Sequence, residues 1–526
     1  MARTGRGRAK VERVLGPARS IEAALEGVLV EAGLREEFEP YTAPEPSLEG
    51  RVDLRELVSF TIDPETAKDF DDAISVRAEG DGLRVWVHIA DVSFFVPAGS
   101  PLDRGAAGRA FSTYVPGRVA PMLPPELADD LCSLRPHQDR LCLTVEMPFD
   151  AALEAGEPRF YRSVIRSWER FSYGRAEAIL GGRDGTGSEL EEALQLADRL
   201  SAELRRRRFA RGALRIETGE ITFAFDGKGG VERAWRESEP RAHALIEELM
   251  ILANEAVAGL LASRRREALY RVHERPDPQA VGHLLAKLVE LEVPTPPAAE
   301  ANGLSPAQAE QLVARASEHV TRYVGQAKRG QEAFPALVLR ALKQARYDVR
   351  NLGHSGLASR AYCHFTSPIR RYPDLVCHRA LLRELGVDAG GEEELTELAE
   401  HTSLRERAAA DIEYQADDLC LVWLLESQLF ERGWDAPFEG EIIGLIGSGL
   451  FARFGDVYEG FLPARRLPGD YFELNPLGTT LVGRRGGRTF RLGDPIAVRV
   501  ETIKRGEGKV DLTLAGPGSP SGRRRA

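Results

Sequence analysis

Apolar positions near the start of the chain recur every three or four residues, which is the period of one face of a helix. These positions are Ile21, Ala24, Leu25, Val28, Leu29 and Leu34. Ser20 is a suitable N-cap, and Gly33 stands where such a helix commonly ends. Residues 1–50 are therefore predicted to form a small helical segment.

The pattern changes near Leu57 to short runs rich in β-branched residues, which are typical of strands. The runs cover residues 58–62, 73–76 and 83–87, and Glu-Gly-Asp-Gly at 79–82 predicts a turn between the last two. Helical spacing then dominates from about Arg175 to Phe430. We expect a mixed α/β body over residues 51–430.

From Pro437 onward, apolar and polar residues alternate over short stretches that are separated by glycine-rich turns. This pattern is typical of a small β-barrel, and residues 449–463 resemble the OB-fold of the ribosomal S-one type. The predicted fold class is α+β, with a barrel over residues 436–515 and a flexible tail at 516–526. In such barrels exposed aromatic residues stack on RNA bases, and Phe451, Phe454 and Tyr458 are candidates, with a place in the barrel core as the alternative.

Composition narrows the function classes. The 526 residues are 43% hydrophobic and 29% charged, as in ordinary soluble proteins of several domains. No apolar run reaches the roughly 18 residues of a membrane span, and no signal-peptide core follows the basic N-terminus. The five cysteines are scattered and form no Cys-x-x-Cys pair, which argues against a redox motif or a zinc site. We expect a cytoplasmic protein with buried, reduced thiols and no membrane partner.

The net charge of −11 argues at first sight against a nucleic-acid partner, because phosphate binding requires a local positive field. The distribution of charge matters more than its sum. Arg205–Arg208 form a run of four, with Arg211 and Arg215 just beyond, and both ends of the chain are basic. Because such runs are often solvated helix faces, phosphate contact and simple solvation both remain open.

Four aspartates lie within ten residues, at the end of one predicted strand and the start of the next: Asp63, Asp69, Asp71 and Asp72. Two like charges about 4 Å apart repel by roughly 4 kcal/mol at an effective dielectric constant near 20, so the cluster needs a counter-charge. Oxygen-only ligands favour Mg²⁺, or Mn²⁺, over Zn²⁺. A pair of such ions can activate a water molecule and stabilise the leaving oxygen of a phosphodiester.

Two other interpretations of this loop differ in strength. A calcium loop of the EF-hand type needs Gly at its sixth and Glu at its twelfth position, where this sequence has Lys68 and Ile74. A solvated acidic turn remains an alternative, although β-rich flanks and the apolar Phe70 within the loop argue against it.

The stretch from Thr61 to Ala73 resembles the signature of the ribonuclease II/ribonuclease R family. Other segments agree with the family in the same order, over roughly residues 50–430 and the terminal barrel. They include His-Ile-Ala-Asp-Val-Ser at 88–93, Ser-Thr-Tyr-Val-Pro-Gly at 112–117, Tyr-Arg-Val-His-Glu at 270–274, Gly-His-Ser-Gly-Leu-Ala at 353–358 and Thr-Ser-Pro-Ile-Arg-Arg-Tyr at 366–372.

This resemblance implies an RNB-type catalytic domain and a processive exoribonuclease that degrades single-stranded RNA from its 3′ end to nucleoside 5′-monophosphates. It implies that Asp63, Asp69, Asp71 and Asp72 bind Mg²⁺, or Mn²⁺, and that Asp72 and Arg370 act in catalysis. The planar guanidinium of Arg370 would neutralise charge on the non-bridging phosphate oxygens. We expect a monomer that uses no nucleotide cofactor.

The resemblance also implies residues that contact RNA. Tyr114 matches an aromatic that holds the last nucleotide by stacking, which is worth about 1 to 3 kcal/mol per base, with a buried core tyrosine as the alternative. Ile216 falls near the position of the family's second stacking aromatic. The other candidates are Glu248, Glu413 and Arg371.

Three features depart from the family pattern. Family members usually carry two cold-shock barrels before the catalytic domain, and fifty helical residues cannot hold even one. Ile216 replaces an aromatic, and a long lysine-rich C-terminal tail is absent. The N-terminal segment is therefore predicted to be either a replacement nucleic-acid-binding element or a packed cap.

Two competing functions are disfavoured by the sequence. A non-catalytic RNA-binding protein could keep this fold, but the intact aspartates and Arg370 argue against it. A nucleotide polymerase could also use paired acids, but the chain has no phosphate-cradling Gly-x-x-x-x-Gly-Lys loop.

Overall fold

A seven-stranded sheet forms the centre of the protein in a computed structural model, with the strand order β11-β4-β5-β6-β9-β10-β3. The structure describes residues 2–4, 8–11, 13–17, 20–34, 37–216, 219–227, 229–236, 240–296, 303–391 and 394–515. In this sheet β11 is parallel to β4 and β3 is parallel to β10, whereas the other neighbours are antiparallel. The strands are β3 (Val52–Asp53), β4 (Phe60–Asp63), β5 (Asp72–Glu79), β6 (Gly82–Ala90), β9 (Asp139–Phe149), β10 (Arg159–Arg166) and β11 (Glu169–Ser172).

Helices cover both faces of this sheet because its buried side chains alternate between two apolar clusters. Ile74 and Val76 of β5 pack into one cluster with α4 (Tyr173–Leu180), α5 (Glu189–Ala210) and α6 (Arg241–Ser263). Ala73 of the same strand packs into the other with α2 (Val92–Phe95) and α3 (Pro101–Arg109). Helix α10 (Tyr372–Glu384) contributes residues to both clusters.

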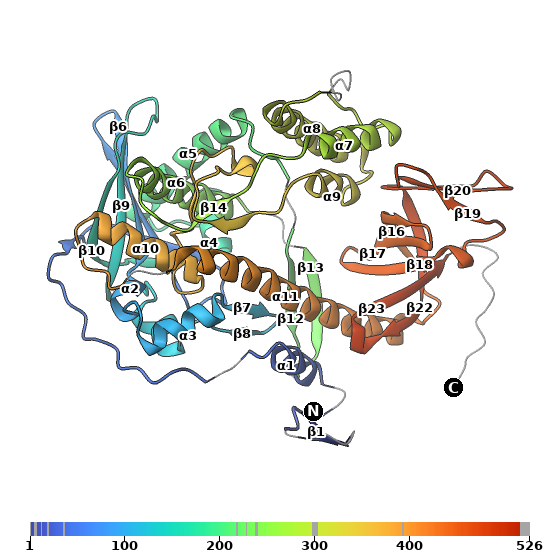
Figure 1. The fold of residues 1–526 in the computed structure, drawn as a ribbon, viewed down its shortest axis with the longest axis horizontal. Helices are drawn as coiled ribbons and strands as arrows, with labels where there is room; N and C mark the ends of the chain where they lie inside the picture. The colour runs from blue at the N-terminus through green and yellow to red at the C-terminus, as the bar shows by residue number, and fades with distance from the viewer. Residues whose placement is uncertain are drawn as a thin grey trace.

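A separate helical group and several hairpins surround this body (Figure 1). Helices α7 (Pro278–Glu290), α8 (Pro306–Ala327) and α9 (Ala333–Arg340) share an apolar core of their own. The hairpins are β1 (Ala2–Thr4) with β2 (Arg8–Lys10), β7 (Thr113–Val115) with β8 (Arg118–Ala120), β12 (Ile221–Phe225) with β13 (Val231–Arg236) and β14 (Tyr270–Val272) with β15 (Arg346–Asp348).

The long helix α11 (Leu395–Arg432) runs from the sheet to the C-terminal barrel (Figure 1). The barrel is closed, and its strands follow the order β16-β17-β18-β23-β22. These strands are β16 (Phe438–Ile446), β17 (Gly449–Phe454), β18 (Tyr458–Pro463), β22 (Pro495–Lys504) and β23 (Lys509–Leu514). Between β18 and β22 the chain adds a small sheet of β19 (Phe472–Leu474), β20 (Thr480–Gly483) and β21 (Thr489–Arg491).

The barrel corrects part of the predicted aromatic surface. Phe454 is only 1% exposed and Tyr458 is also buried, so both belong to the barrel core, and their prediction as stacking platforms is wrong. The reason is the alternation along β17, which directs Phe454 inward and Phe451 outward. Phe451 is 39% exposed and therefore remains a candidate for stacking on a base.

Several other sequence-based predictions are confirmed. The fold is α+β with a C-terminal barrel, and α1 (Ile21–Glu31) is capped by Ser20, whose hydroxyl accepts a hydrogen bond from the Ala23 amide. All five cysteines are buried. Among the described residues, no helix is both long enough and apolar enough to span a bilayer. The predicted tail at 516–526 lies outside the described residues.

Helix α11 carries a carboxyl group whose protonation bears on stability. Burial, followed by the charges of Asp418 and Glu413, raises the pKa of Asp417 to about 7. The folded chain therefore holds this proton more tightly than the unfolded chain, and the associated stability is lost as pH rises from about 4 towards 7.

We expect Asp417→Asn to raise the melting temperature at pH 8 by about 1 °C, since it removes a destabilising charge worth roughly 1 kcal/mol after solvent screening. The increase should shrink as pH falls towards 4, and thermal melts at both pH values measure it. Asp411→Asn, at an exposed position of the same helix, is the matched control. Equal shifts at pH 4 and pH 8 would contradict the expectation.

Candidate active site

The acidic loop joins two neighbouring strands of the central sheet. Strand β4 ends at Asp63 and β5 begins at Asp72, and the two strands pair through Phe60 and Ile74. The loop between them leaves the sheet and returns at the same edge. It therefore brings Asp63 back towards Asp72, whose charge acts on it.

This loop is fixed by the body of the protein and is not a solvated turn. The amide of Phe70 donates to Ser133 Oγ at 3.0 Å, and that hydroxyl donates to the Lys68 carbonyl at 2.6 Å. The Phe70 ring is buried, and the guanidinium of Arg170 lies over it, 5.3 Å from the ring centroid. These contacts exclude the alternative of a wet acidic turn.

Two of the four aspartates are held by specific partners. Asp71 is 3% exposed, and its Oδ1 accepts a hydrogen bond of 2.8 Å from the Ile369 amide. Its Oδ2 lies 3.4 Å from Arg370 Nε but has no hydrogen-bond partner. Asp69 Oδ2 accepts a hydrogen bond of 2.8 Å from the Tyr114 hydroxyl. Asp69 and Asp71 thus connect the acidic loop to the segments that carry Tyr114 and Arg370.

Burial makes the ionised form of these carboxyl groups costly. It is the main cause that raises the pKa of Asp63, with the charge of Asp72 second. Burial also raises the pKa of Asp72 and of Asp71, against the opposing effect of Arg370. Asp63 Oδ2, like Asp71 Oδ2, is buried without a hydrogen-bond partner. This is the environment expected where a positive charge is to be bound.

The two arginines of the Ser-Pro-Ile-Arg-Arg segment have different surroundings. The side chain of Arg370 is 46% exposed and donates from Nη2 to Ser367 Oγ at 3.2 Å. Arg371 instead makes a two-pronged contact with the buried carboxylate of Asp374, at 3.0 and 2.7 Å. Arg370 can therefore offer donors to an anion, whereas the Arg371 charge is already compensated. The structure therefore gives no support to the prediction that Arg371 contacts RNA, because its guanidinium is already bound to Asp374.

Tyr114 and Glu413 reach the same place from distant parts of the chain. The Tyr114 amide donates to Glu413 Oε1 at 2.7 Å, while its hydroxyl bonds to Asp69. The Tyr114 side chain is 37% exposed, so the alternative of a buried core tyrosine is excluded. Strands and helices that are far apart in sequence therefore bring together Asp63, Asp69, Asp71, Asp72, Tyr114, Arg370 and Glu413.

Other residues that were predicted to contact RNA are engaged by other parts of the protein. Glu248 is 2% exposed and accepts from Arg208 Nε at 3.0 Å, so its prediction as a residue that lines an RNA path is wrong. The same pair uses one arginine of the basic run, and Arg206 and Arg207 bind Glu203. Ile216 packs against the core of α7, α8 and α9. Its role in RNA binding stays a prediction.

The sequence reasoning missed Tyr173. The residue before it, Ser172, pairs with Asp63 in the parallel ladder of β11 and β4, and Tyr173 begins α4. Burial, then the charges of Asp72 and Asp63, raises the pKa of Tyr173, which identifies these carboxylates as its neighbours. Only the pairing of β11 with β4 reveals this proximity, and no short-range pattern predicts that pairing.

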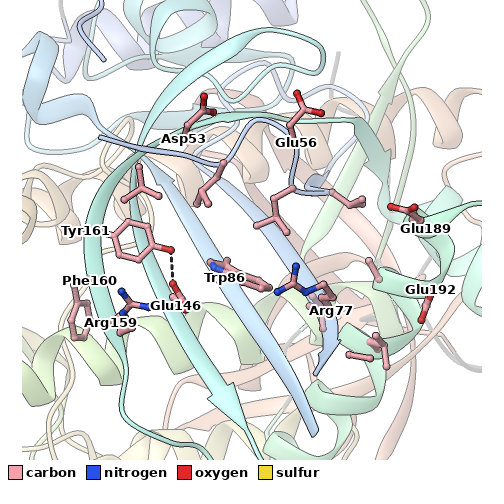
Figure 2. A pocket seen from close by; sticks show the side chains of 18 residues that line it. Asp53, Glu56, Arg77, Trp86, Glu146, Arg159, Phe160, Tyr161, Glu189 and Glu192 are labelled. Carbon is pink, nitrogen blue, oxygen red and sulfur yellow. Dashed lines mark hydrogen bonds and ion pairs between the residues drawn. The ribbon is translucent and has the colours of Figure 1, made fainter. Parts of the chain in front are cut away.

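A cavity of about 980 Å³ lies elsewhere on the molecule. Figure 2 shows Trp86 and Arg77 on its strands, with Asp53 and Glu56 on the segment above and Glu189 and Glu192 at the side. Tyr161 bonds to Glu146 within it at 2.7 Å. None of the predicted catalytic residues lines this cavity, so it is not the reaction site.

The ligand set of four aspartates stays a prediction. The described residues contain no group of three or more His, Cys, Asp or Glu side chains arranged to hold one metal ion. Tyr114 donates a hydrogen bond to Asp69 and Ile369 donates one to Asp71. A metal site that uses only one or two of these carboxylates is compatible with this arrangement.

Comparison with known proteins agrees with this geometry. The model of the RNB domain matches residues 51–386. Ribonuclease R of Escherichia coli is 36% identical over 501 residues, which cover 92% of this chain and 59% of that protein. The chain thus spans about three fifths of the length of this relative.

Solved structures are also similar. Mycoplasma genitalium RNase R in complex with ribose-methylated single-stranded RNA matches with a TM-score of 0.87 and 28% identity, over 96% of this chain and 79% of that one. Yeast Ssd1, a pseudonuclease, matches with a TM-score of 0.69 and 18% identity, over 89% of this chain and 58% of that one, which is a likeness of fold alone. The sequence match over most of the chain decides the relationship: the chain belongs to the RNB domain family.

Proposed function

We propose that this protein is a metal-dependent exoribonuclease that hydrolyses single-stranded RNA from its 3′ end to nucleoside 5′-monophosphates, in RNA degradation or processing. One observation carries the proposal. In one acidic loop, the buried, unpaired Oδ2 of Asp71 lies 3.4 Å from the accessible guanidinium of Arg370, Asp63 has a second such oxygen, and Asp69 binds the hydroxyl of the exposed Tyr114. Relatives named ribonuclease R support the assignment of RNA as the substrate.

The carboxylates fit a magnesium ion better than a metal of softer ligand preference. Mg²⁺ is usually held by one or two carboxylates together with water and substrate phosphate oxygens, so a cage of four acids is not required. Asp63 and Asp72 would hold it, because the charge of Asp72 acts on Asp63 and Asp63 Oδ2 lacks a hydrogen bond. When bound, the ion supplies charge neutralisation at the phosphate and lowers the pKa of water.

The protein's own side chains would position the scissile phosphate. Arg370 is oriented by Ser367 and lies next to Asp71, so its remaining N–H groups can donate to non-bridging oxygens as negative charge builds on them. Asp71 ties that arginine loop to the acidic loop through the Ile369 amide. Tyr114, held at both ends by Asp69 and Glu413, would place the terminal nucleotide.

A non-catalytic RNA-binding protein is the second candidate function. The similarity of fold to a pseudonuclease means that the fold by itself does not decide between the two. Asp63, Asp71, Asp72 and Arg370 favour catalysis, because a protein that only bound RNA would have no need for buried, unpaired carboxylates in contact with an arginine.

The direct test uses a 5′-labelled single-stranded oligonucleotide with Mg²⁺, and products are resolved by length. We expect stepwise shortening from the 3′ end, complete loss of cleavage after chelation with EDTA, and recovery when Mg²⁺ or Mn²⁺ is restored. A parallel digestion of a duplex with a 3′ overhang reports whether structured RNA is degraded. An intact substrate in the presence of Mg²⁺ would favour the non-catalytic alternative.

Replacing Asp72 separates chemistry from binding. We expect Asp72→Asn to lower the cleavage rate roughly a thousandfold or more, since a lost metal ligand removes several kcal/mol of transition-state stabilisation, while RNA still binds. Single-turnover cleavage and filter binding measure the two effects. Asp81→Asn, in the exposed β5–β6 turn, is the control. Undiminished turnover in Asp72→Asn would reject the metal site.

Tyr114 is tested through affinity. Tyr114→Ala should raise KM for an oligonucleotide about tenfold, because it removes one stacking contact worth about 1 to 3 kcal/mol. Tyr414→Ala, at a 70% exposed position on α11, should leave KM unchanged. Steady-state kinetics compare them, and equal values of KM in the two variants would show that Tyr114 does not hold the nucleotide.

A further inference from the structure

The short hairpin β7–β8 carries Tyr114 and is joined to the acidic site at its inner end. Besides the two contacts of Tyr114 itself, the neighbouring Ser112 amide donates to the Arg370 carbonyl at 3.0 Å. Strands of three residues each hold few ladder hydrogen bonds, so a hairpin of this size is not stable alone. Its position therefore depends both on these inner contacts and on what packs against its outer end.

Helix α11 supplies most of that packing, and α1, which packs on α11, adds apolar side chains to the same cluster. Val115, the residue after Tyr114, is buried in one apolar cluster with Leu25, Val28 and Leu29 of α1 and with Leu419 of α11. Figure 1 shows α1, β7, β8 and α11 side by side, in agreement with this cluster. The N-terminal helix thus forms part of the support beneath the hairpin.

An ion pair adds a directional contact to this support. Glu26 of α1 is buried and binds Arg118 of β8 through Oε2. Arg118 is paired with Val115 in the β7–β8 ladder, next to the Tyr114–Val119 pair. The other oxygen, Glu26 Oε1, accepts from Arg13 Nη2 at 2.6 Å. Arg118, the residue that Glu26 binds, therefore lies in the ladder position next to that of Tyr114.

We propose that α1 positions Tyr114, and that the ion pair between Glu26 of α1 and Arg118 of β8 is the polar contact through which it does so. In this arrangement the helix sets where the Tyr114 ring stands above Asp69, and so how well the terminal nucleotide is held. The proposal rests on the proposed exoribonuclease function for its kinetic consequences, but the structural coupling does not depend on catalysis.

The composition of α1 favours this role over direct RNA binding. Its sequence from Ile21 to Glu31 contains three glutamates and no lysine or arginine. Its apolar face is already buried against the hairpin and α11. A surface of this charge would repel a phosphate backbone, so the helix acts as a packed support and not as a nucleic-acid-binding element.

The first test compares Glu26→Ala with Glu22→Ala, which makes the same change at an exposed position of the same helix. We expect Glu26→Ala to raise KM for single-stranded RNA about three- to fivefold with little change in kcat, in line with a partly buried ion pair. Arg118→Met, which removes the pair from the hairpin side, should give a similar increase. An unchanged KM in Glu26→Ala would overturn the proposal.

A double-mutant cycle distinguishes positioning from general destabilisation. If Glu26 acts through Tyr114, Glu26→Ala should have no further effect on KM in the Tyr114→Ala background. If its effect there is as large as in the wild-type background, α1 acts by another route and the proposal fails.

Hydrogen exchange of the peptide that contains residues 113–120 provides a readout that needs no activity. Exchange should be faster in Glu26→Ala than in Glu22→Ala, and equal rates would contradict the coupling. If the wild-type protein does not cleave RNA, the proposed function fails, whereas this measurement still decides whether α1 holds the hairpin.

Discussion

The cost of burying several carboxyl groups in one place is the constraint on which the rest of the site depends. Asp63, Asp71 and Asp72 all have raised pKa values because burial penalises their charge. Neighbouring segments offset part of that penalty at Asp71 with the Ile369 amide and the Arg370 guanidinium, and the Tyr114 hydroxyl binds the fourth acid, Asp69. The donors come from two parts of the chain, the segment of Ile369 and Arg370 and the hairpin of Tyr114, so these contacts also assemble the groups that would face the substrate.

Part of this site could be predicted from the sequence because it depends on short-range patterns. Strand-like flanks around the acidic loop placed Asp63 and Asp72 at adjacent strand ends, and Ser20 was identified as the cap of α1 from its neighbours alone. The resemblance to the family added Tyr114 and Arg370, whose proximity to the acids is a long-range property. The predictions that were wrong concern residues whose surroundings are set by distant segments or by strand register, which the sequence does not show. Glu248 is neutralised by Arg208 across two helices, and Phe454 turns inward with the register of its strand.

The arginines account for the apparent conflict between an acidic chain and an anionic substrate. Arg208 and Arg379 are buried in ion pairs with Glu248 and Asp103, and Arg371 is bound to Asp374. These three positive charges therefore stabilise the interior and do not contribute to an outer basic surface. Recognition of a phosphate would then depend on a few well-placed donors such as Arg370, and less on the overall field of the protein.

The length of helix α11 mechanically connects the C-terminal barrel to Tyr114. Its 38 residues correspond to a rod about 57 Å long, at a rise of 1.5 Å per residue. Glu413, near the middle of the rod, holds the Tyr114 amide, and Leu425 and Leu429, near its far end, pack into the core shared with the barrel. A rigid rod of this length behaves as a lever, in which a tilt of one degree at one end displaces the other by about 1 Å. A displacement of the barrel would therefore reach the backbone of Tyr114 as a smaller displacement, because Glu413 lies about half-way along the rod.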